Sequence, residues 1–156
     1  MVSAMTTLRE VLGPAELAAR VGELTGRPAE WIARVRLDAE GRWYERIHID
    51  GGYEIWLISW LPGQSTGFHD HGGSSGAFGV VWGDLDEYQP GAPERRVSPG
   101  TVRSFGPRYI HDVRNTSSST VAVSVHAYSP PLSEMTRYNL TAGGLIAAGT
   151  EGEGDW

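Results

Sequence analysis

The sequence predicts a mostly β fold, a sandwich or a barrel, with short helices at its N-terminal end. From Arg42 onward, short runs rich in Val, Ile, Trp and Tyr alternate with turn residues, and 21 glycines are spread along the chain. Such runs are typical of all-β domains rather than of helical bundles. The 156 residues suit a single domain, and neither an internal repeat nor a linker divides them.

The first part of the chain, over about residues 8–36, predicts helices that pack against the strands. Pro14 and Gly26 suit the start and the end of a helix, and the apolar residues between them recur at helical spacing: Leu17, Val21 and Leu24. A second short helix is expected from Pro28, with three residues facing inward: Trp31, Ile32 and Val35. Nothing in this segment indicates chemistry.

The strands of the β domain are expected over about residues 42–140. Asp50, Gly51 and Gly52 predict a hairpin turn between the first two strands. The expected strands are 42–49, 53–61, 66–70, 77–82, 85–88, 102–105, 110–115, 120–128 and 136–140. The remaining segment, 141–156, is rich in glycine and acidic at its end, so we expect a frayed, partly mobile tail.

Composition and charge exclude several classes of function. The net charge is −6 and the 13 Lys and Arg are scattered, so we expect neither a nucleic acid nor a membrane as partner. The absence of cysteine excludes disulfides, thiolate metal ligands and a cysteine nucleophile. Residues 1–8 lack the basic and apolar regions of a signal peptide. We therefore expect a cytoplasmic protein, and a monomer.

His69 and His71 form the first pattern that indicates chemistry. On a strand, residues two apart point to the same face, so the two imidazoles would project side by side. Such a pair can supply two nitrogen ligands to one metal, and imidazole suits Fe, Zn, Cu and Ni. Taken alone, the pattern fits two exposed loop histidines equally well.

The spacing around this pair resembles the first motif of the cupin superfamily, whose elements here are Gly63, His69, His71, Gly76 and Gly83. That motif normally carries a glutamate where Gly76 stands. A looser second half resembles the second cupin motif, with Gly100, Gly106, His111 and Asn115. The resemblance implies a double-stranded β-helix, or jelly-roll, barrel. It also implies that His69, His71 and His111 are three metal ligands without a carboxylate ligand.

A longer stretch, from about Tyr44 to Met135, resembles the cysteine dioxygenase type I family of thiol dioxygenases. The match includes Trp60, nine residues before His69, then the run Ser65-Thr-Gly-Phe-His-Asp-His-Gly-Gly-Ser-Ser, and finally Ser124-Val-His-Ala-Tyr-Ser-Pro-Pro. The resemblance implies Fe(II) as the metal, with a small thiol and O₂ as reactants. The implied reaction adds both oxygen atoms to the sulfur of L-cysteine to give cysteine sulfinic acid, without an organic cofactor.

Ser124, His126 and Tyr128 alternate along one predicted strand and therefore share one of its faces. Three polar groups in a dry core would be unfavourable unless they bind each other or a ligand. The alternative is that this face is exposed to solvent. The family resemblance implies that the three residues form a hydrogen-bonded relay beside the iron, and hence act in catalysis.

Tyr44 and Arg46 form another pair on one face of a strand. An arginine that faces the interior needs an anion, whereas a surface arginine could pair with Glu45 or Glu54. The resemblance implies that Arg46 binds the carboxylate of the substrate, with Tyr44 close by. Trp60 belongs to the matched stretch and is taken as a third residue at the substrate, although its apolar ring also suits the core.

Two features affect the choice of substrate and the state of the tyrosine. In related 3-mercaptopropionate dioxygenases a glutamine usually replaces Arg46, so its presence favours cysteine. In the mammalian type of the family a cysteine is crosslinked to the relay tyrosine. Gly76 stands at that position, so we expect Tyr128 to be unmodified. The alternatives are another small thiol (3-mercaptopropionate, cysteamine or mercaptosuccinate), a non-enzymatic ligand-binding cupin, and a Zn or Ni hydrolase or isomerase.

Overall fold

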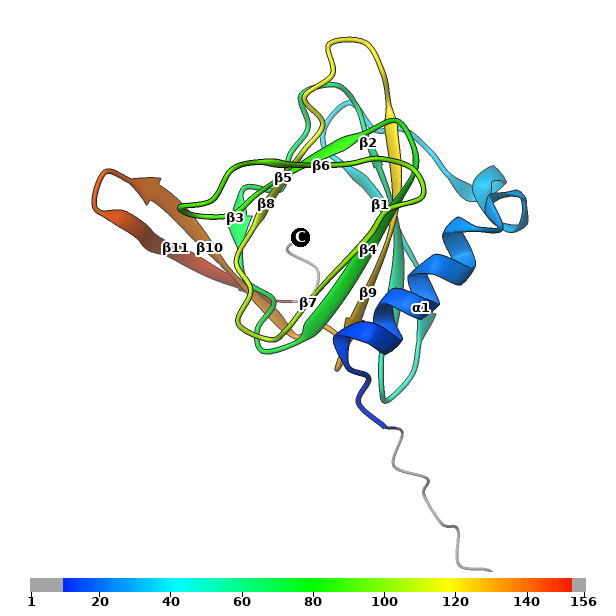
Figure 1. Ribbon diagram of the computed structural model, residues 1–156, viewed down its shortest axis with the longest axis horizontal. Helices are drawn as coiled ribbons and strands as arrows, with labels where there is room; N and C mark the ends of the chain where they lie inside the picture. The colour runs from blue at the N-terminus through cyan, green and yellow to red at the C-terminus, as the bar shows by residue number, and fades with distance from the viewer. Residues whose placement is uncertain (1–9, 153–156) are drawn as a thin grey trace, which may run out of the picture.

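Short antiparallel strands form a barrel, and one helix packs on its outside (Figure 1). The computed structural model describes residues 10–152. The first two residues of the predicted helical segment, 8–9, and the last part of the predicted tail, 153–156, lie outside the described residues. The helix α1 spans Pro14–Thr25. The strands are β1 (Trp43–Ile49), β2 (Glu54–Trp60), β3 (Phe68–His69), β4 (Ser75–Trp82), β5 (Leu85–Tyr88), β6 (Arg95–Val97), β7 (Val102–Phe105), β8 (Asp112–Arg114), β9 (Ala122–Ser129), β10 (Glu134–Thr141) and β11 (Gly144–Gly152).

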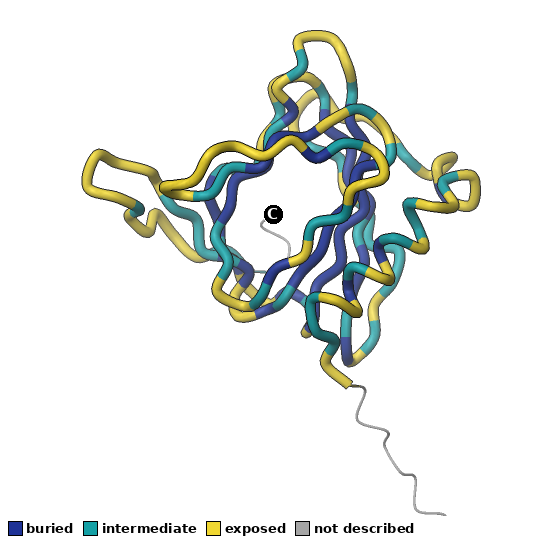
Figure 2. Tube along the Cα trace, in the orientation of Figure 1, coloured by how far each residue is buried: buried dark blue, intermediate teal, exposed yellow. Residues whose placement is uncertain are grey.

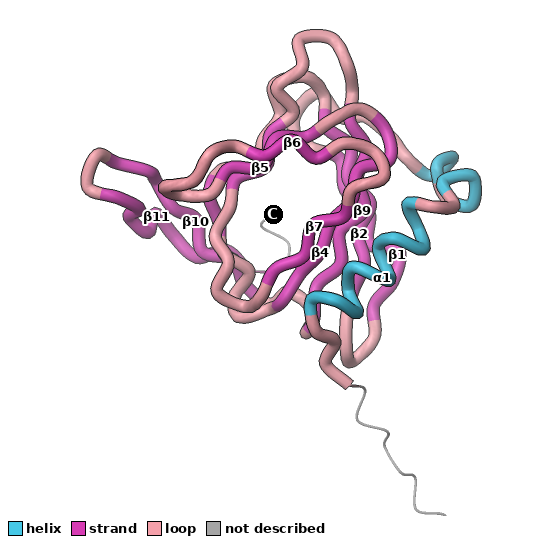
Figure 3. Tube along the Cα trace, viewed as in Figure 1, coloured by secondary structure: helices cyan, strands magenta, loops and turns pink. Residues whose placement is uncertain are grey.

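The strands form three antiparallel sheets that together surround the interior (Figure 3). The largest sheet has the order β1-β2-β9-β4-β7, and the two smaller ones have the orders β11-β10-β3 and β6-β5-β8. A backbone bridge between His69 and His111 connects the smaller sheets. The prediction of a mostly β fold is confirmed. In the described part of the chain, no helix has the length and apolar character needed to cross a membrane.

Helix α1 covers the outer face of the large sheet. Pro14 occupies its first turn and Gly26 ends it, as predicted, and Leu17 and Val21 are completely buried. The second predicted helix is only partly correct, because residues 28–30 and 32–34 form two 3₁₀ turns. Trp31 is buried there, whereas Ile32 is 40% exposed, so its predicted inward orientation is wrong.

Strand β9 runs through the middle of the large sheet and is buried along its whole length. Val123, Val125 and Ala127 pack in the apolar cluster beneath α1, whereas Ala122 and Tyr128 belong to the cluster inside the barrel. The alternation places the polar face of β9 in the interior, where buried backbone surrounds the centre (Figure 2). The solvent-exposed alternative for this face is excluded.

The predicted frayed tail is wrong for residues 144–152, which form strand β11. This strand pairs with β10 from Glu134↔Gly152 to Thr141↔Gly144, and the hairpin projects from one side of the barrel (Figure 1). Gly144 has a φ of 111°, which suits glycine in the tight turn. Strand β6 was not predicted either. Both strands lack the dense apolar alternation by which the others were found, and pairing with a neighbour satisfies their backbone groups.

Candidate metal centre

Three buried histidines meet inside the barrel. His69 ends β3, His71 follows two residues later, and His111 lies opposite His69, joined to it by two backbone hydrogen bonds of 3.0 and 3.2 Å. Their exposed fractions are 4%, 1% and 2%, and one ring nitrogen from each lies within 4.8 Å of the other two. The sequence prediction that these histidines form one cluster is therefore confirmed.

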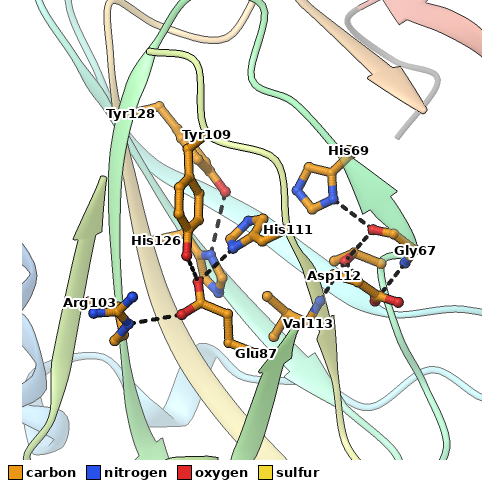
Figure 4. A network of polar contacts seen from close by, with 11 residues as sticks. Gly67, His69, Glu87, Arg103, Tyr109, His111, Asp112, Val113, His126 and Tyr128 are labelled. Carbon is orange, nitrogen blue, oxygen red and sulfur yellow. Dashed lines mark hydrogen bonds and ion pairs between the residues drawn. The ribbon is translucent and has the colours of Figure 1, made fainter. Parts of the chain in front are cut away.

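Hydrogen bonds orient two of the three rings (Figure 4). The Nδ1 of His69 lies 2.8 Å from the carbonyl oxygen of Gly67, and the Nδ1 of His111 lies 2.8 Å from a carboxylate oxygen of Glu87. Both partners only accept hydrogen bonds, so each Nδ1 carries the proton and each Nε2 keeps its lone pair. This is the usual preparation of a histidine for metal binding through Nε2.

The third ring, that of His71, provides the test of whether the site fits a metal. Within the described residues, neither of its ring nitrogens makes a hydrogen bond of normal geometry, although both are buried. Its ring instead packs against the tilted ring of Phe105 and stacks with the ring of Tyr128, at centroid distances of 4.6 and 5.5 Å. A buried, unpaired imidazole is unfavourable unless a ligand satisfies it. A metal ion bound by the three histidines would do so.

Electrostatics keep this cluster in the form that binds metals. Burial, with the neighbouring His111 as second cause, lowers the pKa of both His69 and His71 well below the usual value for histidine. The imidazoles of His69 and His71 are therefore neutral near pH 7. Three imidazole nitrogen donors suit Fe, Zn, Cu or Ni, and the residues present fit a resident metal.

The relay residues predicted on β9 lie beside this cluster. Ser124 Oγ is 2.8 Å from His126 Nε2, and His126 Nδ1 is 3.4 Å from the Tyr128 hydroxyl. Burial lowers the pKa of His126 to about 3 and raises that of Tyr128, so both are neutral. The indole N–H of Trp60 donates to Ser124 Oγ at 2.8 Å, and Trp60 is completely buried. Trp60 therefore lies behind the relay, not in contact with the cavity.

A cavity opens from the histidines toward solvent. Its walls combine apolar and polar side chains: Trp56, Ile58, Val113, Leu132 and Met135, with Arg42, Tyr44, Thr66, His69, His111, His126, Tyr128 and Arg137. Of the predicted site residues, it brings together Tyr44, two metal ligands, and His126 with Tyr128. The cavity thus brings two of the three clustered histidines together with two arginines, Arg42 and Arg137.

Arg46, the predicted carboxylate ligand, is not among the residues that line the cavity. Its guanidinium lies 3.4 Å from the buried carboxylate of Glu54 and stacks on the ring of Trp56. This matches the alternative that pairs Arg46 with Glu54. The register of β1 against β2 is regular from Trp43 to Arg46, so the neighbouring strand β2, which carries Trp56 and Glu54, decides the partners of Arg46.

Two other arginines face the cavity, and sequence reasoning missed both. Arg42, directly before β1, lies over the ring of Trp60, and burial, with nearby Arg137 as second cause, lowers its pKa. Arg137 on β10 donates to Glu151 on β11 at 3.0 Å and to the carbonyl oxygen of Thr66 at 2.5 Å. The β10–β11 hairpin thus positions one of the two cations. Arg42 shares its alternation with Tyr44, a signal that could have identified it.

Glu87 is a further residue that the sequence did not indicate. It is 2% exposed on β5, and it accepts hydrogen bonds from His111, from the Tyr109 hydroxyl at 2.9 Å and from Arg103 Nε at 2.8 Å (Figure 4). Burial alone would raise the pKa of Glu87, but the hydrogen bonds from His111 and Arg103 lower it to about 2. A charged carboxylate therefore lies directly behind the ring of His111, one of the three clustered histidines.

Comparison with known proteins identifies the family. The family model described as cysteine dioxygenase type I matches residues 4–141. The chain belongs to the cysteine dioxygenase type I family. It is 29% identical over 131 residues to cysteine dioxygenase type 1 of Rattus norvegicus, an alignment that covers 74% of this chain but 64% of the rat protein. The chain thus matches less than two thirds of the length of that relative.

Solved structures support the fold. A double-stranded β-helix protein from Klebsiella pneumoniae aligns with a TM-score of 0.58 at 15% identity, covering 76% of this chain and 93% of that one. A cupin protein from Desulfovibrio desulfuricans aligns with a TM-score of 0.53 at 20% identity, covering 63% and 91%. At these identities the likeness concerns the fold alone. The predicted cupin barrel is confirmed.

In this member of the cysteine dioxygenase type I family, the packing of neighbouring rings leaves no room for a side chain at position 76. A Cβ atom at Gly76 would lie 2.4 Å from Phe105 Cζ and 3.0 Å from Tyr128 Cδ1. Phe105 fills the space beside the glycine, and it continues the stack of rings through Tyr109 at 4.6 Å. The relay tyrosine is therefore held by packed aromatic rings in a chain that has no cysteine.

Gly76→Ala is accordingly expected to lower the free energy of unfolding by about 1–3 kcal/mol, the usual effect of overpacking a core. The measurement is thermal or urea denaturation of the metal-free protein. Gly106→Ala is the matched control, because a Cβ atom there meets nothing within 4 Å. Equal stability of the two variants would show that Phe105 does not restrict position 76.

Proposed function

We propose that this protein is an Fe(II)-dependent cysteine dioxygenase. The reaction adds both atoms of O₂ to the sulfur of L-cysteine and gives cysteine sulfinic acid, so no further reductant is needed. The observation that carries this proposal is His71. Within the described residues its buried ring nitrogens make no hydrogen bond of normal geometry, and it belongs to a cluster of three histidines beside a cavity lined by two arginines. Family membership supports the same reaction.

His69, His71 and His111 would hold the metal. Bound there, iron(II) would supply the affinity for a thiolate and for dioxygen, since three neutral ligands leave its charge uncompensated. The ring stack around His71 and the hydrogen bonds of His69 and His111 keep the three nitrogens in place before any metal binds.

Arg42 binds the carboxylate of the substrate in this proposal, in place of the predicted Arg46. Its guanidinium faces the cavity, and Tyr44 lines the wall beside it. An arginine in a partly buried cavity gains most from an anion that can accept two hydrogen bonds. Arg137 adds a second positive charge, although Glu151 offsets part of it. These cations favour a thiol with a carboxylate over cysteamine.

The relay on β9 positions the Tyr128 hydroxyl. Trp60 donates to Ser124, whose hydroxyl can then donate to His126 Nε2, so that His126 Nδ1–H points at the oxygen of Tyr128. In this arrangement the proton of Tyr128 is free to donate into the cavity. The relay would thus orient a hydrogen-bond donor toward the reacting groups, where a fixed donor is most effective.

The test is oxygen uptake by protein that has been loaded with Fe(II) under anaerobic conditions. We expect uptake with L-cysteine, slower uptake with 3-mercaptopropionate and mercaptosuccinate, and the weakest uptake with cysteamine, which has no carboxylate. A clear preference for another carboxylated thiol would keep the reaction and change the substrate. Absence of uptake with every thiol, despite one bound iron per chain, would favour the ligand-binding cupin and overturn the proposal.

A further inference from the structure

The buried carboxylate of Glu87 contacts the cluster of three histidines and takes no part in the proposed reaction. Glu87 lies on β5, its carboxylate contacts His111, and it is 2% exposed (Figure 4). It does not line the cavity, so it does not contact a substrate there. Its two oxygens nevertheless both accept hydrogen bonds, one from Arg103 on β7 and two from Tyr109 and His111 in the segment before β8.

We propose that Glu87 is a positioning residue for the metal: it fixes the tautomer of His111 and supplies, through that ring, the negative charge that the three-histidine set lacks. Gly76 stands where the related motif carries a carboxylate ligand, so the metal ligands themselves are neutral. The inference rests on the metal site of the proposed function, and it is independent of the thiol and of its oxidation.

The three ligands are oriented by three different means, and only one of these carries charge. His69 donates to a backbone carbonyl, His71 is held by stacked rings, and His111 donates to a carboxylate. A carboxylate behind a ligating histidine makes the imidazole more basic and therefore a stronger donor to the ion. Glu87 would thus act on the metal indirectly, through the imidazole of His111.

Arg103 and Tyr109 fix the direction of this carboxylate. Arg103 Nε donates to one carboxylate oxygen, while the Tyr109 hydroxyl donates to the same oxygen that accepts from His111. Glu87 therefore cannot rotate away from His111 without losing two other hydrogen bonds. The ion pair with the partly exposed guanidinium of Arg103 also offsets part of the cost of burying the Glu87 carboxylate.

The test compares Fe(II) affinity, measured by competition with a chelator in the absence of thiol and oxygen, in four variants. Glu87→Gln keeps the shape but removes the charge, and we expect it to weaken iron binding by about 10- to 100-fold. Arg103→Gln removes one of the hydrogen bonds that fix the carboxylate but leaves its charge against His111, so it should weaken iron binding less than Glu87→Gln does. The double variant should lose as much as Glu87→Gln. Asp86→Asn is the control, because that neighbouring carboxylate pairs with Arg96 and Thr116.

The double variant separates the two explanations of a loss. If it regains wild-type affinity, the loss in Glu87→Gln came from the unpaired charge of Arg103, and the proposal is wrong. Unchanged affinity in Glu87→Gln, or an equal loss in Arg103→Gln, would also overturn it. Nitrogen-15 NMR of the metal-free wild type gives a second readout: His111 should carry its proton on Nδ1 and not on Nε2. None of these measurements involves a thiol or oxygen, so a result that overturns the role of Glu87 leaves the proposed oxidation to its own test.

Discussion

Iron binding is expected to be lost when His71 is replaced by leucine, while the metal-free protein keeps its stability or gains some. The ring contributes one of the three proposed ligands. Loss of a residue that only hydrogen-bonds a ligand lowers metal affinity by up to about 100-fold, so loss of the ligand itself should lower Fe(II) affinity by more than that. Within the described residues neither ring nitrogen makes a hydrogen bond of normal geometry, so an apolar side chain removes a poorly satisfied buried group, which costs about 1–3 kcal/mol. Iron content after anaerobic loading and denaturation of the metal-free protein measure the two effects.

Loss of iron together with unchanged or higher stability of the metal-free protein distinguishes a metal ligand from a structural histidine. A structural role predicts that His71→Leu destabilises the metal-free protein, with iron lost only because the chain unfolds. His48→Leu serves as the control, because that histidine is about one third exposed and pairs with Asp50 outside the cluster. One iron per chain in folded His71→Leu protein would contradict the assignment of the ligands.

The second large effect is expected at Arg42. Arg42→Met removes the proposed partner of the substrate carboxylate, and a hydrogen bond to a charged group is worth about 1.5–3 kcal/mol. The kcat/KM for L-cysteine should therefore fall by about 10- to 150-fold. Turnover of cysteamine, which has no carboxylate, should hardly change. Steady-state oxygen uptake with both thiols measures the difference.

Arg46→Met is the matched variant of Arg42→Met. It should leave the kinetics with L-cysteine nearly unchanged, but it should lower the stability of the protein, because Glu54 is 1% exposed and loses its guanidinium partner. A loss of kcat/KM in Arg46→Met as large as that in Arg42→Met would restore the sequence-based assignment. It would then place the carboxylate against Arg46 instead.

The sequence predicted the features that depend on alternation and on spacing. The faces of β9 followed from its alternation of small apolar and polar residues, and the three histidines followed from their motif. The choice between Arg42 and Arg46 could not follow from either. Both alternate with Tyr44, and only the pairing of β1 with β2 brings the guanidinium of Arg46 to Glu54.

The missed features depend on contacts between distant segments. Glu87 lies 24 residues before His111, and nothing in its own strand distinguishes it from Asp86 until the barrel closes. The glycines of β11 made this strand hard to predict from the sequence. Its pairing with β10 nevertheless brings Glu151 to Arg137, which pairs with His69 of β3. Tertiary pairing, rather than local preference, decides such positions.

The most direct test of the central claim is the origin of the oxygen atoms in the product. Protein loaded with Fe(II) is supplied with L-cysteine and ¹⁸O₂, and the product is examined by mass spectrometry. We predict cysteine sulfinic acid that carries two ¹⁸O atoms, formed in equal amount to the oxygen consumed. A product with one labelled atom, or a disulfide formed while oxygen is reduced, would contradict a dioxygenase that acts on the sulfur of cysteine.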